Sequence, residues 1–338
     1  MTHEFKQLLE VAYQWQSKGI RSVLATVVDL EGSSYRRPGV RMLISETGDM
    51  HGAVSGGCVE KEVLIQSKSV FKTGIAKVMT YDGRFRLGCE GILYVLLEPL
   101  QISETIFNRV QDCFRKRKAF TSTSYFEPEF IESNTFGTQL EIDGNAFSLH
   151  PSFSFQQSDK LQLFKQDFQP IFQIYIFGAE HDAVQLCDLA SKIGWDVHII
   201  APPDEQKTID YFKGATSLSA PLMDAIDVWG IGENTAVVLM SHSFSKDVQY
   251  LIALKDTNPT YLGLLGPSSR RERLISEILN FVPDISYEFI EKIHGPTGLN
   301  IGAETPSEIA LSILAEILSV IRDAEPMPLR EKSGKIHD

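Results

Sequence analysis

The sequence predicts an α/β protein whose C-terminal part folds as a doubly wound parallel sheet. From residue 171 to residue 322, strand-like and helix-like patterns alternate, which is the order that a parallel sheet with helices on both faces requires. Five β-rich runs and two helical patterns occupy the first 100 residues, which predicts a separate N-terminal α/β domain. A chain of 338 residues is long enough for about two domains.

We expect the N-terminal domain to span residues 1–100. Apolar residues at helical spacing predict helices over 5–17 and 59–72. The last of the five β-rich runs is apolar on both faces, which predicts a central buried strand. The predicted strands cover residues 22–28, 41–45, 50–54, 76–81 and 92–97.

Residues 101–170 predict a short β-rich linker region, with a helical pattern over 101–120 and alternating runs on either side of the turn signal Asp143-Gly144-Asn145. We expect the C-terminal domain over 171–325 and a polar tail over 326–338. The predicted strands of the C-terminal domain cover 171–177, 197–201, 236–240 and 261–265. Its predicted helices cover 183–193, 247–255, 272–280 and 306–322.

The composition is typical of a soluble globular protein, with 43% hydrophobic and 22% charged residues. The net charge of −12 argues against nucleic acid or an anionic membrane as a general partner. The start of the chain is polar, and no apolar run approaches the ~18 residues of a membrane span. No CxxC pair occurs, so we expect a reducing, cytoplasmic location; the four cysteines are Cys58, Cys89, Cys113 and Cys187.

The most informative local feature is the turn Ser55-Gly56-Gly57-Cys58, which lies between a predicted strand and a predicted helix. The two glycines permit a sharp turn and the close approach of another group to the backbone. Cys58 lies at a helix N-terminus, which favours an anion and therefore the reactive thiolate. The pattern predicts a site for an anionic or thiophilic ligand, with Cys58 as the candidate catalytic thiol and metal ligand. The alternative is that Cys58 is a small buried hydrophobic residue.

Cys89 is the second candidate catalytic thiol, in the run Gly88-Cys89-Glu90-Gly91 at the entry of the predicted central strand. No further Cys or His accompanies Cys58 and Cys89 at metal-finger spacing, which argues against a structural zinc site. Two thiols on neighbouring strand ends are still able to share one soft metal or one sulfur-bearing ligand.

The turn after residue 177 has the position of the Rossmann dinucleotide fingerprint. Gly178, Ala179 and His181 are candidate cofactor-binding residues there, but Glu180 stands where the fingerprint needs glycine. The fingerprint also requires an acidic residue near the end of the second strand. Asp204 is the candidate for it, but Pro202 and Pro203 displace it from the expected position. Both departures weaken the prediction of ordinary NAD binding, although the crevice of such a sheet remains a default ligand site.

Three more loops follow strands of the same sheet and should face the same crevice; they cover residues 241–247, 263–271 and 294–306. His242 is suited to bind an oxyanion or to move a proton, or else it is a bystander next to a helix cap. Arg270 and Arg271 are suited to phosphate, or else they are surface charge. The other candidate cofactor-binding residues in these loops are Gly263, Gly266, Gly298 and Glu304.

Taken together, these stretches resemble the XdhC/CoxI family of molybdenum-cofactor maturation proteins, over about 25–98 and 172–320. The matching N-terminal motifs are Gly32-Ser33-Ser34-Tyr35-Arg36-Arg37-Pro38-Gly39, Gly52 to Glu60, and Gly88-Cys89-Glu90-Gly91. The matching C-terminal motifs are Tyr175 to His181, Ser241-His242, Tyr261 to Gly266, and Gly298 to Ala310. The chain departs from the family at Tyr35, Glu180 and Pro202-Pro203.

The resemblance implies a cytoplasmic, homodimeric accessory factor rather than an enzyme. Such proteins bind the molybdopterin form of the molybdenum cofactor, are associated with its sulfuration by a cysteine desulfurase, and assist its insertion into an apo molybdenum hydroxylase such as xanthine dehydrogenase. Iron–sulfur cysteine spacing is absent, so hydroxylase activity of the chain itself is not supported. The alternatives are an NAD(P)-dependent oxidoreductase that uses the 178–183 turn, and an interaction scaffold that binds neither ligand.

Overall fold

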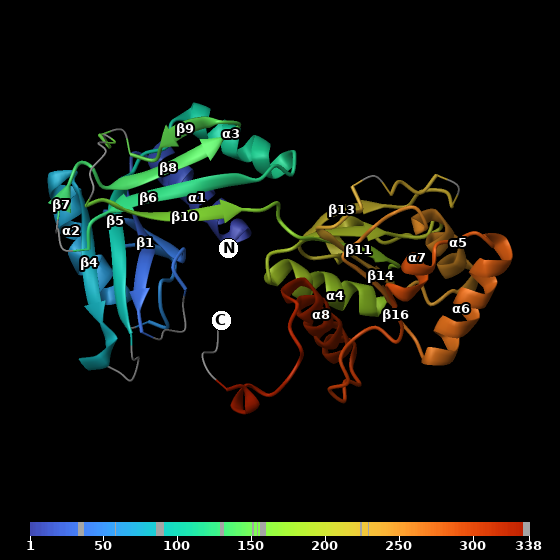
Figure 1. The fold of residues 1–338 in the computed structure, drawn as a ribbon. Coiled ribbons are helices and arrows are strands. Elements are labelled where there is room, and N and C mark those ends of the chain that lie inside the picture. The colour runs from blue at the N-terminus through green and yellow to red at the C-terminus, as the bar shows by residue number, and fades with distance from the viewer. Residues whose placement is uncertain are drawn as a thin grey trace. The chain divides into compact units, whose positions relative to one another are not determined.

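The computed structural model divides the chain into two compact units (Figure 1), which we call the N-terminal unit, Met1–Pro170, and the C-terminal unit, Ile171–Lys332. Antiparallel sheets in the first unit and a parallel six-stranded sheet in the second confirm the predicted fold class. The residues that the structure describes are 1–32, 37–57, 59–85, 91–128, 132–150, 152–153, 155, 160–223, 225–228 and 230–333.

A six-stranded antiparallel sheet with the order β3-β2-β1-β5-β4-β7 is the centre of the N-terminal unit. Its strands are β1 (Ser22–Glu31), β2 (Arg41–Ser45), β3 (Met50–Gly52), β4 (Ala76–Asp82), β5 (Ile92–Leu100) and β7 (Glu132–Ser133). The central place of β5 confirms the prediction from its two apolar faces. Helix α2 (Glu60–Thr73) packs on β1, β4 and β5, and α1 (Thr2–Ser17) packs on β1, β2 and β3.

The segment for which we expected a linker belongs to the same compact unit. It contains α3 (Glu104–Arg115) and a four-stranded antiparallel sheet with the order β10-β6-β8-β9. Its strands are β6 (Phe120–Phe126), β8 (Gly137–Ile142), β9 (Asn145–Ser148) and β10 (Gln162–Phe168). Aromatic rings of α1 and of this sheet share one core, in which Phe5 stacks on Phe168 at 4.5 Å between ring centroids.

Buried polar side chains join the two sheets of the N-terminal unit. The Arg41 guanidinium lies over the Phe5 ring, 5.1 Å from its centroid, and donates a hydrogen bond to Ser122 Oγ at 3.0 Å. Glu98, which has no exposed surface, accepts hydrogen bonds from the backbone N–H and the hydroxyl of Thr138, at 2.8 and 2.5 Å. Burial raises the pKa of Glu98 to about 7, against the opposing effects of Thr138 and Arg41.

The C-terminal unit is a parallel sheet with the order β13-β12-β11-β14-β15-β16, which is the strand order of the doubly wound dinucleotide-binding fold. Its strands are β11 (Gln173–Phe177), β12 (Asp196–Ile200), β13 (Ala215–Ser219), β14 (Thr235–Leu239), β15 (Tyr261–Leu264) and β16 (Ile293–His294). Helices α4 (His181–Lys192) and α8 (Pro306–Arg322) pack side by side on one face. Helices α5 (Phe244–Leu254), α6 (Ser268–Phe281) and α7 (Tyr287–Glu291) cover the other face.

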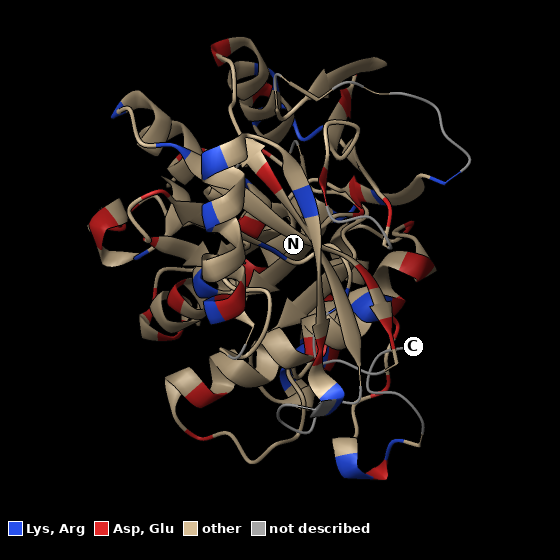
Figure 2. Cartoon of the chain, turned by 90° about the vertical axis from the view of Figure 1, so that its left-hand side faces the viewer, with Lys and Arg blue, Asp and Glu red and all other residues tan. Residues whose placement is uncertain are grey.

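Lys and Arg are interspersed with Asp and Glu along both helices and strands (Figure 2). The net charge of the chain is −12. Within the described ranges, no helix combines the length and the apolar character needed to cross a membrane.

The raised pKa of Glu98 predicts a pH-dependent stability of the N-terminal unit. A carboxyl that holds its proton more tightly when folded stabilises the fold at low pH, and this contribution is lost between its unfolded pKa of 4.5 and its folded pKa of about 7. Relative to Glu98→Gln, the wild type should therefore lose about 3 kcal/mol of unfolding free energy between pH 4.5 and pH 8.

Denaturant unfolding, followed through Trp15 after Trp195 and Trp229 are replaced by Phe, measures this difference in the N-terminal unit alone. A wild type and a Glu98→Gln variant whose stability difference stays constant from pH 4.5 to pH 8 would contradict the assignment.

Candidate functional site

The described ends of the N-terminal motifs predicted from the sequence lie at one end of the six-stranded sheet, which we call the motif end. Strands β1 and β5 run antiparallel, and their register places Glu31 opposite Ile92. Gly32, directly after β1, and Gly91, directly before β5, therefore lie at the same end of the sheet. The Gly83 N–H donates to the Gly91 carbonyl at 3.0 Å, which closes the same end of the neighbouring strand.

The Ser55–Glu60 turn belongs to the same end. Strand β3 runs in the direction of β1, because both are antiparallel to β2, so the chain leaves β3 toward the motif end. The last turn of α2 lies at the opposite end, where the Phe71 carbonyl accepts a hydrogen bond from Arg21, directly before β1, at 3.0 Å. The topology thus brings together three segments that lie far apart in the sequence.

Glu60 shapes this turn from inside. Its carboxylate accepts hydrogen bonds from the backbone N–H and the hydroxyl of Ser55, both at 2.7 Å. The Ser55 hydroxyl oxygen accepts in turn from the backbone N–H groups of Gly57 and Val59, at 3.1 and 3.2 Å. Burial opposes the charge of Glu60, but these hydrogen bonds hold its pKa below the usual value. Ser55, which the sequence predicted as a cofactor-binding residue, therefore stabilises the turn through these hydrogen bonds.

No residue that the structure describes covers the outer side of this turn. A Cβ atom added to Gly56 or to Gly57 would meet no described atom within 4 Å. Gly57 has a φ of +119°, which favours glycine, but Gly56 has neither a positive φ nor a close neighbour among the described residues. No contact among the described residues therefore accounts for glycine at position 56.

The predicted thiols Cys58 and Cys89 lie outside the described residues, as do residues 33–36 of the first motif. Within the described part of the chain, no group of three or more His, Cys, Asp or Glu side chains is placed to hold a metal ion. The metal-ligand and catalytic roles predicted for the two thiols therefore stay predictions.

A polar cavity of about 560 Å³ also opens beside the motif end, and the sequence analysis missed it. The Tyr94 hydroxyl donates to Glu31 at 2.7 Å, and this bond raises the pKa of Tyr94 to about 12. The signal in the sequence was the polar ending of an otherwise apolar strand at Asp29 and Glu31. The residues that line this cavity are Asp29, Glu31, Tyr94, Glu127, Pro128, Lys160 and Gln162.

In the C-terminal unit, the predicted fingerprint turn lies where β11 and β14 separate. Gly178 has a φ of +140°, and a Cβ there would lie 2.6 Å from the Met240 carbonyl oxygen. Glycine is therefore required for the two strand ends to pack. Ala179 is fully buried, so its side chain faces the core, whereas His181 begins α4 and is exposed.

His242 joins this turn to the loop after β14. Its Nε2 lies 3.1 Å from Asp182 Oδ2 in the first turn of α4. Its backbone has a φ of +51°, a conformation that costs energy in a residue other than glycine. An exposed imidazole held by a carboxylate at the branch point of the sheet is suited to move a proton or to hold an oxyanion.

The crevice next to this pair is acidic. A cavity of about 290 Å³ is lined by Glu180, Pro202, Asp204, Glu205, Gln206 and Lys246. The single lysine among them is 3.4 Å from Asp204, and Glu205 pairs with Lys207 at 3.2 Å. Lysines thus pair with Asp204 and Glu205, and the like-charge penalty for a pyrophosphate comes from Glu180, as the sequence predicted.

Neither predicted phosphate-binding arginine is free at this edge. Arg270 donates to the buried carboxylate of Asp247 at 2.7 Å. Arg271 donates to the Ile293 carbonyl at 3.0 Å. Both guanidinium groups therefore anchor α6 to neighbouring elements.

The predicted glycines of the remaining loops have packing reasons. A Cβ at Gly263 would lie 2.5 Å from Thr297 Oγ1, and one at Gly298 would lie 2.4 Å from Ser312 Oγ. Gly266 has a φ of +121° and lies against Arg270. The Glu304 N–H donates to Glu308 at 3.0 Å, next to the capping box of α8. Cofactor binding by these residues stays a prediction.

Glu316 organises the loop between β16 and α8. Its carboxylate accepts hydrogen bonds from the Gly298 N–H at 2.7 Å and from the Tyr261 hydroxyl, and it lies 3.2 Å from His294 Nδ1. Burial opposes its charge, but these partners hold the pKa of Glu316 below the usual value. The sequence analysis missed this residue, because it stands inside a regular helical pattern.

The described residues define a two-unit α/β protein with a parallel Rossmann sheet in its C-terminal unit. Residues 174–317 match the XdhC Rossmann domain, and residues 15–82 match the XdhC and CoxI family. A protein of Bacillus subtilis (strain 168) that is named as a probable xanthine dehydrogenase subunit is 31% identical, over 88% of this chain and 92% of that protein. The chain belongs to the XdhC/CoxI family, as its motifs predicted.

Two further similarities point the same way. The "Molybdenum cofactor insertion chaperone PaoD" of Escherichia coli (strain K12) is 26% identical over 95% of this chain and 90% of its own length. A crystal structure from Bacillus halodurans, described as a xanthine dehydrogenase, is 25% identical with a TM-score of 0.76, over 95% of this chain and 98% of that one.

The three partners of Glu316 predict the effect of its removal. Glu316→Leu leaves the Gly298 N–H and the Tyr261 hydroxyl without their acceptor, so the variant should lose about 3 kcal/mol of unfolding free energy. Hydrogen exchange at Gly298 should accelerate more than exchange elsewhere in the C-terminal unit. Glu316→Gln keeps an acceptor oxygen and should show a smaller loss; equal effects of the two variants would contradict the assignment.

Proposed function

We propose that this protein is a chaperone that binds the molybdenum cofactor, assists its sulfuration, and assists its insertion into an apo molybdenum hydroxylase. The observation that carries the proposal is the turn around Gly56 and Gly57, where Glu60 binds Ser55 and a Cβ added at Gly56 would meet no described atom within 4 Å. Membership of the family and the likeness to a protein named as a cofactor insertion chaperone support it.

The chemistry of the cargo fits such a turn. The cofactor offers a thiophilic metal and a sulfur-rich dithiolene, and a thiolate is a suitable ligand for either. In this proposal Cys58 is the leading ligand and sulfur-handling residue, and Cys89 is the second thiol. A turn that is already ordered loses little conformational entropy when it binds, which favours capture of a transient cargo.

We assign the cofactor to the motif end because the glycine turn with the predicted thiol Cys58 belongs there; carboxylates line the cavities at both places. In the crevice, Glu180 stands where the dinucleotide fingerprint needs glycine and opposes a phosphate. The same carboxylate opposes the pyrophosphate of NAD(P), which weakens the oxidoreductase alternative. In this proposal the C-terminal unit contacts a protein partner. The contacting surface includes the His242–Asp182 pair and the 295–305 loop.

The expected partners follow from this role. They are a cysteine desulfurase, which supplies sulfur in exchange for an oxo ligand of the metal, and the apo-hydroxylase that receives the cofactor. A cytoplasmic homodimer completes the proposal. The proposed contacts of this protein are made to the cofactor. The same proposal therefore holds if the receiving hydroxylase is not xanthine dehydrogenase.

The first test compares the wild type with Cys58→Ala after anaerobic purification from a cofactor-replete host. Molybdenum content and pterin fluorescence should be present on the wild type and lost in the variant. Cys187→Ala is the matched control, because burial raises the pKa of Cys187 to about 12 and keeps that thiol protonated. Full cofactor loading of Cys58→Ala would contradict the role of Cys58. Saturable NAD(P)H binding without cofactor on either protein would favour the oxidoreductase.

A second test uses the open space over Gly56. Gly56→Ala adds one methyl group that meets no atom of the described protein, so the variant should fold like the wild type. If the cofactor approaches the backbone there, its affinity should fall roughly tenfold or more. Gly232→Ala is the matched control, because Gly232 likewise has open space and no positive φ. Equal cofactor affinities of the two variants would contradict a close approach at Gly56.

A further inference from the structure

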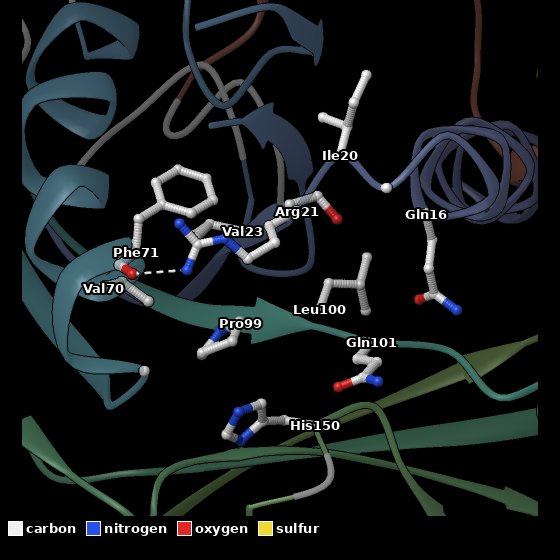
Figure 3. Close-up of a pocket in the computed structure, with 13 residues that line it drawn as sticks. Gln16, Ile20, Arg21, Val23, Val70, Phe71, Pro99, Leu100, Gln101 and His150 are labelled. Carbon is white, nitrogen blue, oxygen red and sulfur yellow. Dashed lines mark hydrogen bonds between the residues drawn. The ribbon is translucent and has the colours of Figure 1, made fainter. Parts of the chain in front are cut away.

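A second cavity of about 390 Å³ lies in the N-terminal unit, at the end of the sheet opposite the motif end (Figure 3). The start of β1 at Ser22, the end of β5 at Leu100 and the last turn of α2 form its walls. Helix α2 has 14 residues, so its length separates this cavity from the Ser55–Glu60 turn by about 21 Å. The volume is in the range of sites that hold small organic molecules.

The floor and the walls of this cavity are mainly apolar. Val23, Val70 and Leu100 supply aliphatic surface, and Pro99 supplies a flat ring. The Phe71 ring also lines the cavity, and the Arg21 guanidinium lies over one of its faces, 5.8 Å from the centroid. Surfaces of this kind favour a flat, mostly apolar ligand over a flexible polar one.

Three polar side chains that line this cavity have no hydrogen-bond partner in the described part of the chain. The Ser22 hydroxyl, the Gln101 amide and the His150 imidazole make no hydrogen bond to any residue that the structure describes. His150 is only 8% exposed, and its ring lies below Pro99 at the cavity in Figure 3. Gln101 is exposed, so its amide is open to water, whereas His150 is nearly buried. A buried polar group without a partner costs stability, so a ligand that supplies a partner to His150 gains affinity.

The cavity has no unpaired charge among its lining residues, all of which the structure describes. Arg21 is the charged residue there, and its guanidinium already binds Glu46 at 2.9 Å and the Phe71 carbonyl at 3.0 Å. Burial lowers the pKa of His150, so the imidazole is neutral at neutral pH and offers one donor and one acceptor. An uncharged ligand therefore fits this site better than an anion or a cation.

We propose that this cavity binds a small, uncharged, flat heterocycle of the nucleobase class, whose edge bonds His150, Gln101 and Ser22 and one face of which contacts Pro99. This site is independent of the cofactor site proposed at the motif end, so each proposal can fail without the other.

Calorimetric titration of the full chain at neutral pH tests the proposal with three probes: adenine, indole and AMP. Adenine offers a hydrogen-bonding edge without charge, indole offers a similar flat surface with a single donor, and AMP adds a charge. Adenine should bind saturably and more tightly than either other probe. His150→Leu and Gln101→Leu should each weaken adenine about tenfold. Gln14→Leu, an exposed amide on α1, is the matched control and should bind as the wild type does.

Thermal unfolding of His150→Leu separates binding from packing. Removal of an unpartnered buried imidazole should leave Tm unchanged or raise it, while adenine binding is lost. A lower Tm with unchanged adenine affinity would make His150 a packing residue and would overturn the proposal. Tighter binding of indole or AMP than of adenine, or no saturable binding of any probe, would overturn it as well.

Discussion

The pairing of β1 with β5 is the constraint on which the N-terminal site depends. Nine residue pairs, with one irregularity between Val27 and Asp29, align the end of one strand with the start of the other. This register places the Gly32 and Gly91 segments at one end of the sheet, next to the turn that opens α2. A slip of one residue would turn every core side chain of the strand toward the opposite face, so burial of both faces keeps the register fixed.

Both units use a partly buried carboxylate to hold a functional loop. Glu60 binds the backbone and the hydroxyl of Ser55, and Glu316 binds the backbone of Gly298 and the hydroxyl of Tyr261. In each case the hydrogen bonds keep the carboxylate charged in spite of burial. A charged acceptor makes stronger hydrogen bonds than a neutral one, which lets short loops keep one conformation with little core of their own.

In the C-terminal unit, the strand order and the residues at the edge of the sheet point to different ligands. Its strand order is that of a dinucleotide-binding sheet, and its crevice lies at the expected branch point between β11 and β14. The residues that line the crevice include Glu180, which opposes phosphate, and Asp204 and Glu205, which pair with lysines. The sheet supplies a frame, and the side chains at its carboxyl edge decide which ligands that frame accepts.

The sequence by itself determined the fold class, the family and the elements with strong local signals. Pro306–Arg322 was predicted with its observed bounds, because a proline at the first turn and a capping box mark its start. The sequence did not reveal β6, whose buried face carries Ser122 and Ser124, because those hydroxyls are buried against polar partners from distant segments. Only the tertiary structure showed that Gly263 makes room for Thr297, whereas a Cβ at Gly56 would meet no described atom within 4 Å. The sequence marks each position only as a glycine, and the difference is set by neighbours that the folded chain brings together.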